Sequence, residues 1–170
     1  MNFIEEIKNR AKQDIKRIVL PETMDVRVLE AAAICSKEEL AVIMLIGKTE
    51  EIATLANENK LDLTNTIVID PFTSDLTDKL ANDLYELRKE KGMTLEKAHE
   101  LLTTDYMYFA CMLVQNDMAD GVVSGACHST ANTLRPALQI LKTAPGTKLV
   151  SAFFFLLFPD CKHGENGIFV

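Results

Sequence analysis

The sequence predicts an α/β protein with three layers, in which helices cover both faces of a parallel β-sheet. Apolar runs of strand length alternate along nearly the whole chain with segments whose apolar residues recur at helical spacing. The second of these runs, LAVIMLIG, is apolar throughout rather than at every second residue, which is typical of a strand buried on both faces. Strands that alternate with helices are joined by right-handed crossovers, and these place the strands parallel in one sheet.

The first half of the chain contains three predicted strands, at residues 16–21, 40–47 and 65–70. Proline ends the first of them and follows the third, and it does not continue a ladder of hydrogen bonds. A helix with an apolar stripe precedes each strand, and each helix begins at a residue whose side chain can cap it. The predicted capping residues are Asn2, Asp25 and Thr49.

The second half of the chain is richer in helix. A long helix is predicted from Ser74 onwards, with Gly92 as its terminator after basic residues. Two more helices are predicted to begin at Thr94 and Asp105, and residues 120–125 are predicted as the fourth strand.

The C-terminal segment is strongly apolar. The run from Leu149 to Phe158 is far shorter than the roughly 20 residues of a membrane-spanning helix, so we predict a fifth, buried strand there. Residues 167–170 resemble the beginning of a further strand, and a domain rarely ends on an apolar element. We therefore expect residues 1–170 to be the truncated N-terminal part of a larger domain.

Composition and charge limit the classes of function. The chain has 170 residues, of which 48 % are hydrophobic and 25 % charged, as in soluble globular domains. A net charge of −7 argues against nucleic acid or an anionic membrane as the main partner. The N-terminus lacks the apolar stretch of a secretory signal, so we expect a cytoplasmic protein with reduced thiols. The four cysteines of the chain are widely spaced: Cys35, Cys111, Cys127 and Cys161.

Small polar residues gather where the fourth strand passes into the next helix, in the segment DGVVSGACHSTANTLRPALQILKT. Ligands of open α/β sheets bind beyond the carboxyl ends of the strands, where helix N-termini present free N–H groups. Gly125 lets the backbone turn or approach a ligand, and Arg135 offers a planar fork suited to two phosphate oxygens. Hydroxyl groups are available from Ser129, Thr130 and Thr133. The segment therefore predicts an anion-binding site.

Pro136 suits the first turn of a helix, so we expect regular helix to begin near Leu134 and residues 128–133 to form a looser polar turn. An alternative to anion binding is that these polar residues only cap the helix while Arg135 pairs with a surface carboxylate. The chain contains neither GxGxxG nor GxxxxGK[ST], so neither standard nucleotide-binding loop is indicated.

Other residues could carry chemistry, but each also has a simpler interpretation. Arg88 lies near a predicted helix end, where the helix dipole favours solvated cations. His128 could transfer protons or simply order a turn, and a nucleophilic pair with Cys127 lacks a third group to orient it. Cys161 and His163 have too few companions for a zinc site, so we predict no metal.

The segment SGACHSTANTLRPALQILKT closely resembles the signature of phosphate acetyltransferases. The stretches RIVLPE, RVLEAA, YELRKEKGMT and KLVSAFFFLLFPD agree with the same family, in its order, over nearly the whole chain. The resemblance implies an enzyme that transfers an acetyl group between coenzyme A and phosphate, with acetyl phosphate as the other partner. Phosphate butyryltransferases are relatives, so butyryl transfer is an alternative.

The resemblance also assigns roles to residues. Ser129, Thr130 and Arg135 correspond to catalytic positions of the family, and Arg88 corresponds to an arginine implicated in binding coenzyme A or phosphate. We add three residues of the same segment as candidate substrate-binding residues: Gly125, Asn132 and Thr133. Coenzyme A would be a substrate, and no metal or bound organic cofactor is implied. A homo-oligomer is expected.

The chain departs from the family in two respects. Members are roughly twice as long, and their second half carries another arginine and the aspartate proposed as general base, so we expect little turnover from this chain alone. In PETMDVRVLEAA the family usually has a glycine and more acidic residues, which leaves the contribution of this loop open. Truncation would expose apolar surface and favour oligomers or aggregates. A noncatalytic α/β module that binds phosphate or an acyl phosphate is the competing hypothesis.

Overall fold

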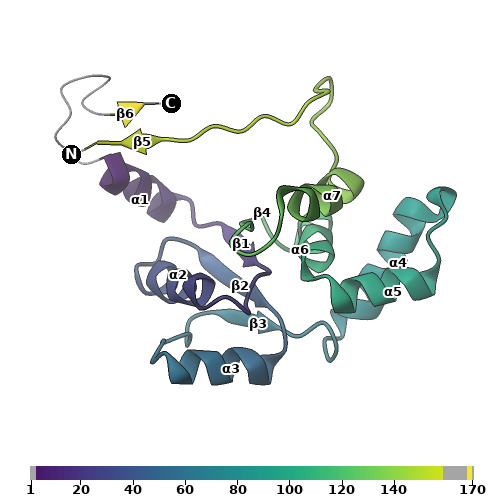
Figure 1. Cartoon of the computed structure of the whole chain (residues 1–170), viewed down its shortest axis with the longest axis horizontal. Helices are drawn as coiled ribbons and strands as arrows, with labels where there is room; N and C mark the ends of the chain where they lie inside the picture. The colour runs from purple at the N-terminus through teal and green to yellow at the C-terminus, as the bar shows by residue number, and fades with distance from the viewer. Residues whose placement is uncertain (1–2, 159–167, 170) are drawn as a thin grey trace.

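A computed structural model of the chain describes residues 3–158 and 168–169. Four strands form a parallel sheet in the order β3–β2–β1–β4, which confirms the predicted sheet (Figure 1). Their bounds are β1 (Arg17–Leu20), β2 (Val42–Ile46), β3 (Ile67–Ile69) and β4 (Gly121–Val122). In this described part no helix is long and apolar enough to cross a membrane.

The strand order brings β1 next to β4, although about a hundred residues separate them in the chain. Val19 pairs with Val122 in the ladder between them. At the amino ends of the two strands, the guanidinium of Arg17 binds the carboxylate of Asp120, with Nη2 3.0 Å from Oδ1. The register therefore places the residues that follow β1 opposite the residues that follow β4, where the anion site was predicted.

One face of the sheet is covered by α2 (Val26–Lys37) and α3 (Thr49–Glu58). The Asp25 side chain caps α2 by accepting from the amide of Arg27, as predicted. Thr49, the predicted cap of α3, lies instead within that helix, after Lys48. Leu45 of β2 packs in this layer against residues of both helices, whereas its neighbours along the strand point to the opposite face.

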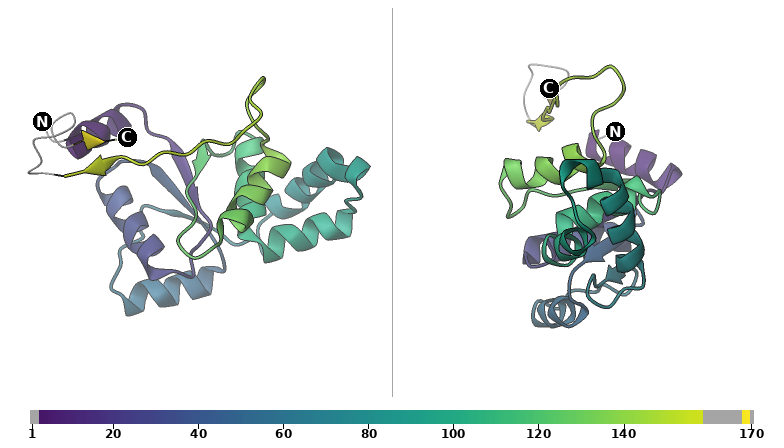
Figure 2. Two further views of the ribbon diagram at one scale, coloured as in Figure 1. Left: turned by 45° about the horizontal axis from the view of Figure 1, so that its top comes forward. Right: turned by 90° about the vertical axis from the view of Figure 1, so that its right-hand side faces the viewer.

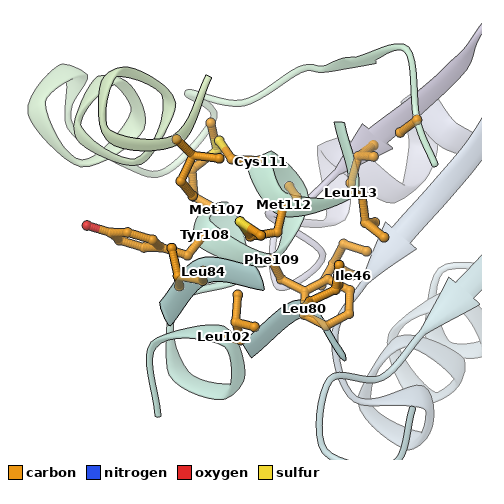
Figure 3. Packing of buried hydrophobic residues seen from close by; sticks show 14 of the residues in the cluster. Ile46, Leu80, Leu84, Leu102, Met107, Tyr108, Phe109, Cys111, Met112 and Leu113 are labelled. Atoms are coloured by element: carbon orange, nitrogen blue, oxygen red, sulfur yellow. The ribbon is translucent and has the colours of Figure 1, made fainter. Parts of the chain in front are cut away.

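On the opposite face α6 (Tyr106–Gln115) packs against the sheet, and three helices pack against α6: α4 (Leu76–Arg88), α5 (Leu95–Thr104) and α7 (Thr130–Ile140). Helix α6 lies at the centre of this layer, and its side chains from Met107 to Leu113 are buried (Figure 3). The predicted caps of α5 and α6, Thr94 and Asp105, are confirmed, since each accepts a hydrogen bond from the first turn of its helix.

Two predicted helix bounds were wrong. The long helix expected from Ser74 begins at Leu76 and ends at Arg88, and a short 3₁₀ turn, η1 (Lys89–Lys91), leads to Gly92. Gly92 has φ 81°, so a glycine terminates the segment as predicted.

Helix α7 begins at Thr130 instead of near Leu134, and Pro136 lies inside it. The helix starts early because the side chain of Ser129 caps it, directly before Thr130. Pro136 is tolerated inside the helix because its burial offsets the backbone hydrogen bond that proline cannot donate.

The predicted fifth strand of the sheet was also wrong. Residues 149–158 form an extended C-terminal arm that leaves α7 and runs back towards α1 (Phe3–Gln13) (Figures 1 and 2). Only β5 (Leu156–Leu157) is a strand, and it pairs antiparallel with β6 (Ile168–Phe169). A strand needs a paired neighbour and a covering layer, and the described part of the chain supplies the arm with little of either. The predicted cap Asn2 and the pair Cys161 and His163 lie outside the described residues.

Candidate anion-binding site at the end of strands β1 and β4

The carboxylate of Glu22 organises the loop that connects β4 to α7. Four consecutive backbone N–H groups donate to it, and we call these groups the amide nest. Oε2 accepts from Gly125 (2.7 Å) and Ala126 (2.8 Å), and Oε1 accepts from Cys127 (3.0 Å) and His128 (2.9 Å). Gly125 has φ 115°, a conformation that favours glycine, so this residue allows the turn that points the amides inwards.

The environment of Glu22 favours its charged form although the residue is only 1 % exposed. Burial alone would raise the pKa of the carboxyl. The hydrogen bonds from the nest and from the ring of His128 outweigh burial and hold the pKa well below its usual range. His128 Nδ1 lies 2.7 Å from Oε1, so the histidine orders the turn. Glu22 is therefore an anion held permanently beside the predicted site.

The segment that follows Glu22 also holds the loop. Arg27 Nη2 donates to the carbonyl oxygen of Ala126 at 3.0 Å, and the Asp25 carboxylate fixes the same guanidinium at 2.6 Å. The sequence PETMDVR, whose contribution was open, thus supports the site from the segment between β1 and α2.

The first turn of α7 carries the predicted hydroxyl groups. Ser129 Oγ accepts from the amide of Asn132 at 3.3 Å, which leaves the hydroxyl proton of Ser129 available to a ligand. Thr133 Oγ1 donates back to the carbonyl of Ser129, so this hydroxyl is already used within the helix. The side chains of Thr130 and Asn132 are exposed and have no partner in the part of the chain that the structure describes.

Arg135, one turn further along α7, is exposed and pairs with no carboxylate among residues 3–158. The alternative of a surface ion pair for Arg135 therefore has no support here. Arg88 approaches α7 from the end of α4, and its Nη1 donates to the carbonyl of Gln139 at 3.2 Å. Its Nε is buried without a partner among the described residues, so Arg88 is not a simple solvated helix end.

Tyr108 lies close enough to both arginines to feel their charge. Its hydroxyl donates to Gln139 Oε1 at 2.9 Å and points away from the other labelled core side chains (Figure 3). Burial, and then the Asp105 carboxylate, raise the pKa of Tyr108, whereas Arg135 and Arg88 act on it in the opposite direction. Both guanidiniums therefore lie within Coulombic range of one hydroxyl.

A pocket of about 400 Å³ adjoins Arg88 where α4 passes through η1 into α5. Lys91 and Lys97 line it together with Arg88, and Glu100 is its one acidic lining residue. Met93 and Leu101 supply apolar lining. Such a pocket suits an anionic group attached to a less polar body.

The cluster of Glu22, Cys127 and His128 has the composition of a metal site, with its ligand atoms within 4.8 Å of one another. Four amides and the ring of His128, however, already occupy the Glu22 carboxylate, so an ion would have to displace these donors. Burial and the neighbouring Glu22 carboxylate raise the pKa of Cys127, which disfavours the nucleophilic thiolate as well.

The sequence predicted the segment from Gly125 to Arg135 as a candidate site, but the predicted residues did not include Glu22 or Tyr108. A signal for Glu22 was present, because it directly follows a buried strand, and the carboxyl ends of parallel strands share one edge of a sheet. Tyr108 gave no such signal, since it lies in an apolar helical run.

Fold and site together define an α/β protein with a candidate anion-binding site at the carboxyl edge of its sheet. The chain belongs to the phosphate acetyl/butaryl transferase family, whose family model matches residues 2–169. It is 52 % identical over its whole length to a phosphate acetyltransferase of Acetivibrio thermocellus and 51 % identical to one of Thermoanaerobacterium thermosaccharolyticum. The chain covers 50 % and 51 % of these two relatives, so it spans about half of their length.

Solved structures agree with this assignment. The EutD phosphotransacetylase from Staphylococcus aureus superposes with a TM-score of 0.84 at 40 % identity, over 94 % of this chain and 49 % of that one. A phosphotransacetylase from Streptococcus pyogenes gives 0.81 at 38 % identity, over 88 % and 46 %. The predicted fold class and family are thus confirmed.

Proposed function

We propose that this chain forms the phosphate-binding wall of an acetyltransferase active site, in which an acetyl group passes between coenzyme A and inorganic phosphate. Acetyl phosphate is the other substrate, and neither a metal nor a bound organic cofactor takes part. Support comes from the family and from relatives named phosphate acetyltransferase that are about half identical to the chain. Because the chain covers about half of their length, the remainder of the active site belongs to the other half.

The observation that carries the proposal is the pair of arginines without acidic partners. The chain has a net charge of −7, yet Arg88 and Arg135 meet no carboxylate among the described residues. Both act on the Tyr108 hydroxyl, and Arg135 lies in the helix whose first turn is formed by Ser129 and Thr130. Such an arrangement favours a dianionic phosphoryl group.

In the direction of acetyl-CoA formation, the thiolate sulfur of coenzyme A attacks the carbonyl carbon of acetyl phosphate. The carbon–sulfur bond forms, the bond from carbon to the phosphate oxygen breaks, and phosphate leaves with that electron pair. Arg135 and the hydroxyls of Ser129 and Thr130 hold the phosphoryl group and stabilise the developing negative charge. Arg88, with Lys91 and Lys97 in the adjoining pocket, is assigned to phosphate groups of coenzyme A.

The proposal is tested by the formation of acetyl phosphate from acetyl-CoA and phosphate, together with binding of each substrate to the 170-residue chain. Arg135→Ala is compared with Arg10→Ala, which removes an exposed arginine of α1. We expect little turnover, because the resemblance places the thiol's general base in the second half, but phosphate binding that Arg135→Ala abolishes and Arg10→Ala preserves. Substantial turnover by the chain alone would contradict the proposal that it forms only half of the active site. If both variants still bind phosphate, the role of Arg135 is contradicted.

A second candidate function is a noncatalytic module that binds phosphate or an acyl phosphate. It is favoured by the fact that the chain spans only about half the length of its relatives. The two differ in their response to coenzyme A, which only the acetyltransferase half-site binds. Butyryl transfer remains the alternative acyl specificity. We further propose a cytoplasmic location and a homo-oligomer, with no nucleic acid or membrane as partner, in keeping with the acidic composition.

A further inference from the structure

We propose that Glu22 is a positioning residue of this site: its carboxylate fills the amide nest and so directs phosphate to the first turn of α7. This inference rests on the proposed function, because it concerns how the same site receives phosphate. Glu22 does not contact the substrate in this proposal, and it acts through the loop of residues 125–128.

The amide nest already holds an anion, the Glu22 carboxylate. Consecutive backbone amides that point to one spot form a general anion site, which elsewhere receives phosphate. Here all four N–H groups of residues 125–128 donate to Glu22, at 2.7 to 3.0 Å. Phosphate therefore cannot enter the nest while Glu22 is charged and in place.

The next donors along the chain are free. Ser129 is the cap of α7, and the amides of Thr130 and Ala131 have no hydrogen-bond partner in the described part of the chain. Because they belong to the first turn of the helix, they also lie at the positive end of its dipole. The amides up to His128 donate to Glu22, and those from Ser129 onwards do not. Glu22 therefore decides which amides remain available to a ligand.

Which amides remain available depends on the loop being fixed from two sides. Glu22 holds the amides, while Arg27 holds the carbonyl oxygen of Ala126 at 3.0 Å. His128 adds a side-chain contact to Glu22 at 2.7 Å, so the residue directly before the helix cap is itself anchored. A neutral or shorter side chain at position 22 would release these groups, so the loop would no longer hold the first turn of α7 in place for phosphate.

The test combines amide hydrogen exchange with phosphate titration of the 170-residue chain. Glu22→Gln keeps the shape but loses the charge, and its NH₂ group cannot accept from an amide. Glu30→Gln makes the same chemical change at an exposed position of α2 and serves as the matched control. Glu22→Asp keeps the charge but shortens the reach, and it replaces Glu22→Gln if that variant fails to fold.

We expect the amides of residues 125–128 to be protected in the wild type and in Glu30→Gln, and to lose protection in Glu22→Gln. Phosphate affinity should fall by about tenfold or more in Glu22→Gln, since charge-assisted hydrogen bonds that order the loop are lost. Loop amides that exchange equally in all three proteins would overturn the inference. So would an unchanged phosphate affinity in Glu22→Gln beside a wild type that binds.

The failure of the proposed function has a different signature. In that case the wild type does not bind phosphate although its loop amides are protected, and both the function and the positioning role are overturned. Arg135→Ala separates the two roles further, since it should weaken phosphate binding while the protection of residues 125–128 stays as in the wild type.

Discussion

Helix α6 and the C-terminal arm are both long apolar stretches, YMYFACMLV and LVSAFFFLLF, but their surroundings are opposite. Phe109 in α6 is 0 % exposed, whereas Phe154 in the arm is 79 % exposed. Helix α6 lies between the sheet and three other helices, while the arm contacts β6 and the ring of Phe3. Apolar composition therefore favours burial, but burial requires other elements to supply a surface.

The largest expected effect is at the centre of α6. Phe109→Ala should destabilise the chain by about 3–5 kcal/mol, because it removes a buried ring and leaves a cavity. Phe154→Ala, the matched change in the arm, should alter stability by no more than about 0.5 kcal/mol. Urea denaturation followed by circular dichroism measures both, and equal effects would remove the distinction between the two regions.

The second prediction concerns self-association. The arm exposes a run of large apolar side chains, and such patches mark contact surfaces. We expect the chain to form oligomers or aggregates in light scattering, and the double change Phe153→Ser and Phe154→Ser to reduce the mean mass. A monodisperse wild-type monomer would show that the exposed arm does not drive association.

A smaller effect is expected where α6 meets the site. Tyr108→Phe removes the hydrogen bond to Gln139 and should cost about 1 kcal/mol of unfolding free energy. Tyr85→Phe is the control, since the hydroxyl of Tyr85 has no hydrogen bond in the described part of the chain. Chemical denaturation compares the two, and an equal loss in Tyr85→Phe would show that the bond to Gln139 adds nothing.

The smallest effect concerns the amino ends of β1 and β4, where Arg17 pairs with Asp120. The Arg17 guanidinium and amide lower the pKa of Asp120 to about 2. An unfolded aspartate titrates near pH 4, so the pair stabilises the fold fully above about pH 4, and this contribution is lost as the pH falls towards about 2.

Asp120→Asn should therefore lower the melting temperature at pH 6, and the difference from the wild type should narrow at pH 2.5. Asp83→Asn, a change on α4, controls for the altered net charge. A difference between Asp120→Asn and the wild type that is the same at both pH values would assign the effect to something other than this ion pair.

Much of the site could be predicted from residues that are close in the chain. The segment from Gly125 to Arg135 combines a turn residue, a helix cap and a cation, and the structure keeps all three at one edge of the sheet. The start of α7 was placed about a turn too late, because Pro136 was weighed alone. Pro136 is buried inside the helix, and Ser129 can cap the helix because Glu22 fixes His128 directly before it.

By itself, the sequence determined the alternation of strands and helices, the parallel sheet and the family, because hydrophobic periodicity, caps and motifs are local properties. Only the tertiary structure decided that β1 lies beside β4, and hence that Glu22 meets the amides of residues 125–128. It also decided that α6 is buried while the arm is not. These outcomes depend on which elements become neighbours, and hydrogen bonds and burial act between neighbours in space, whatever their separation in the chain.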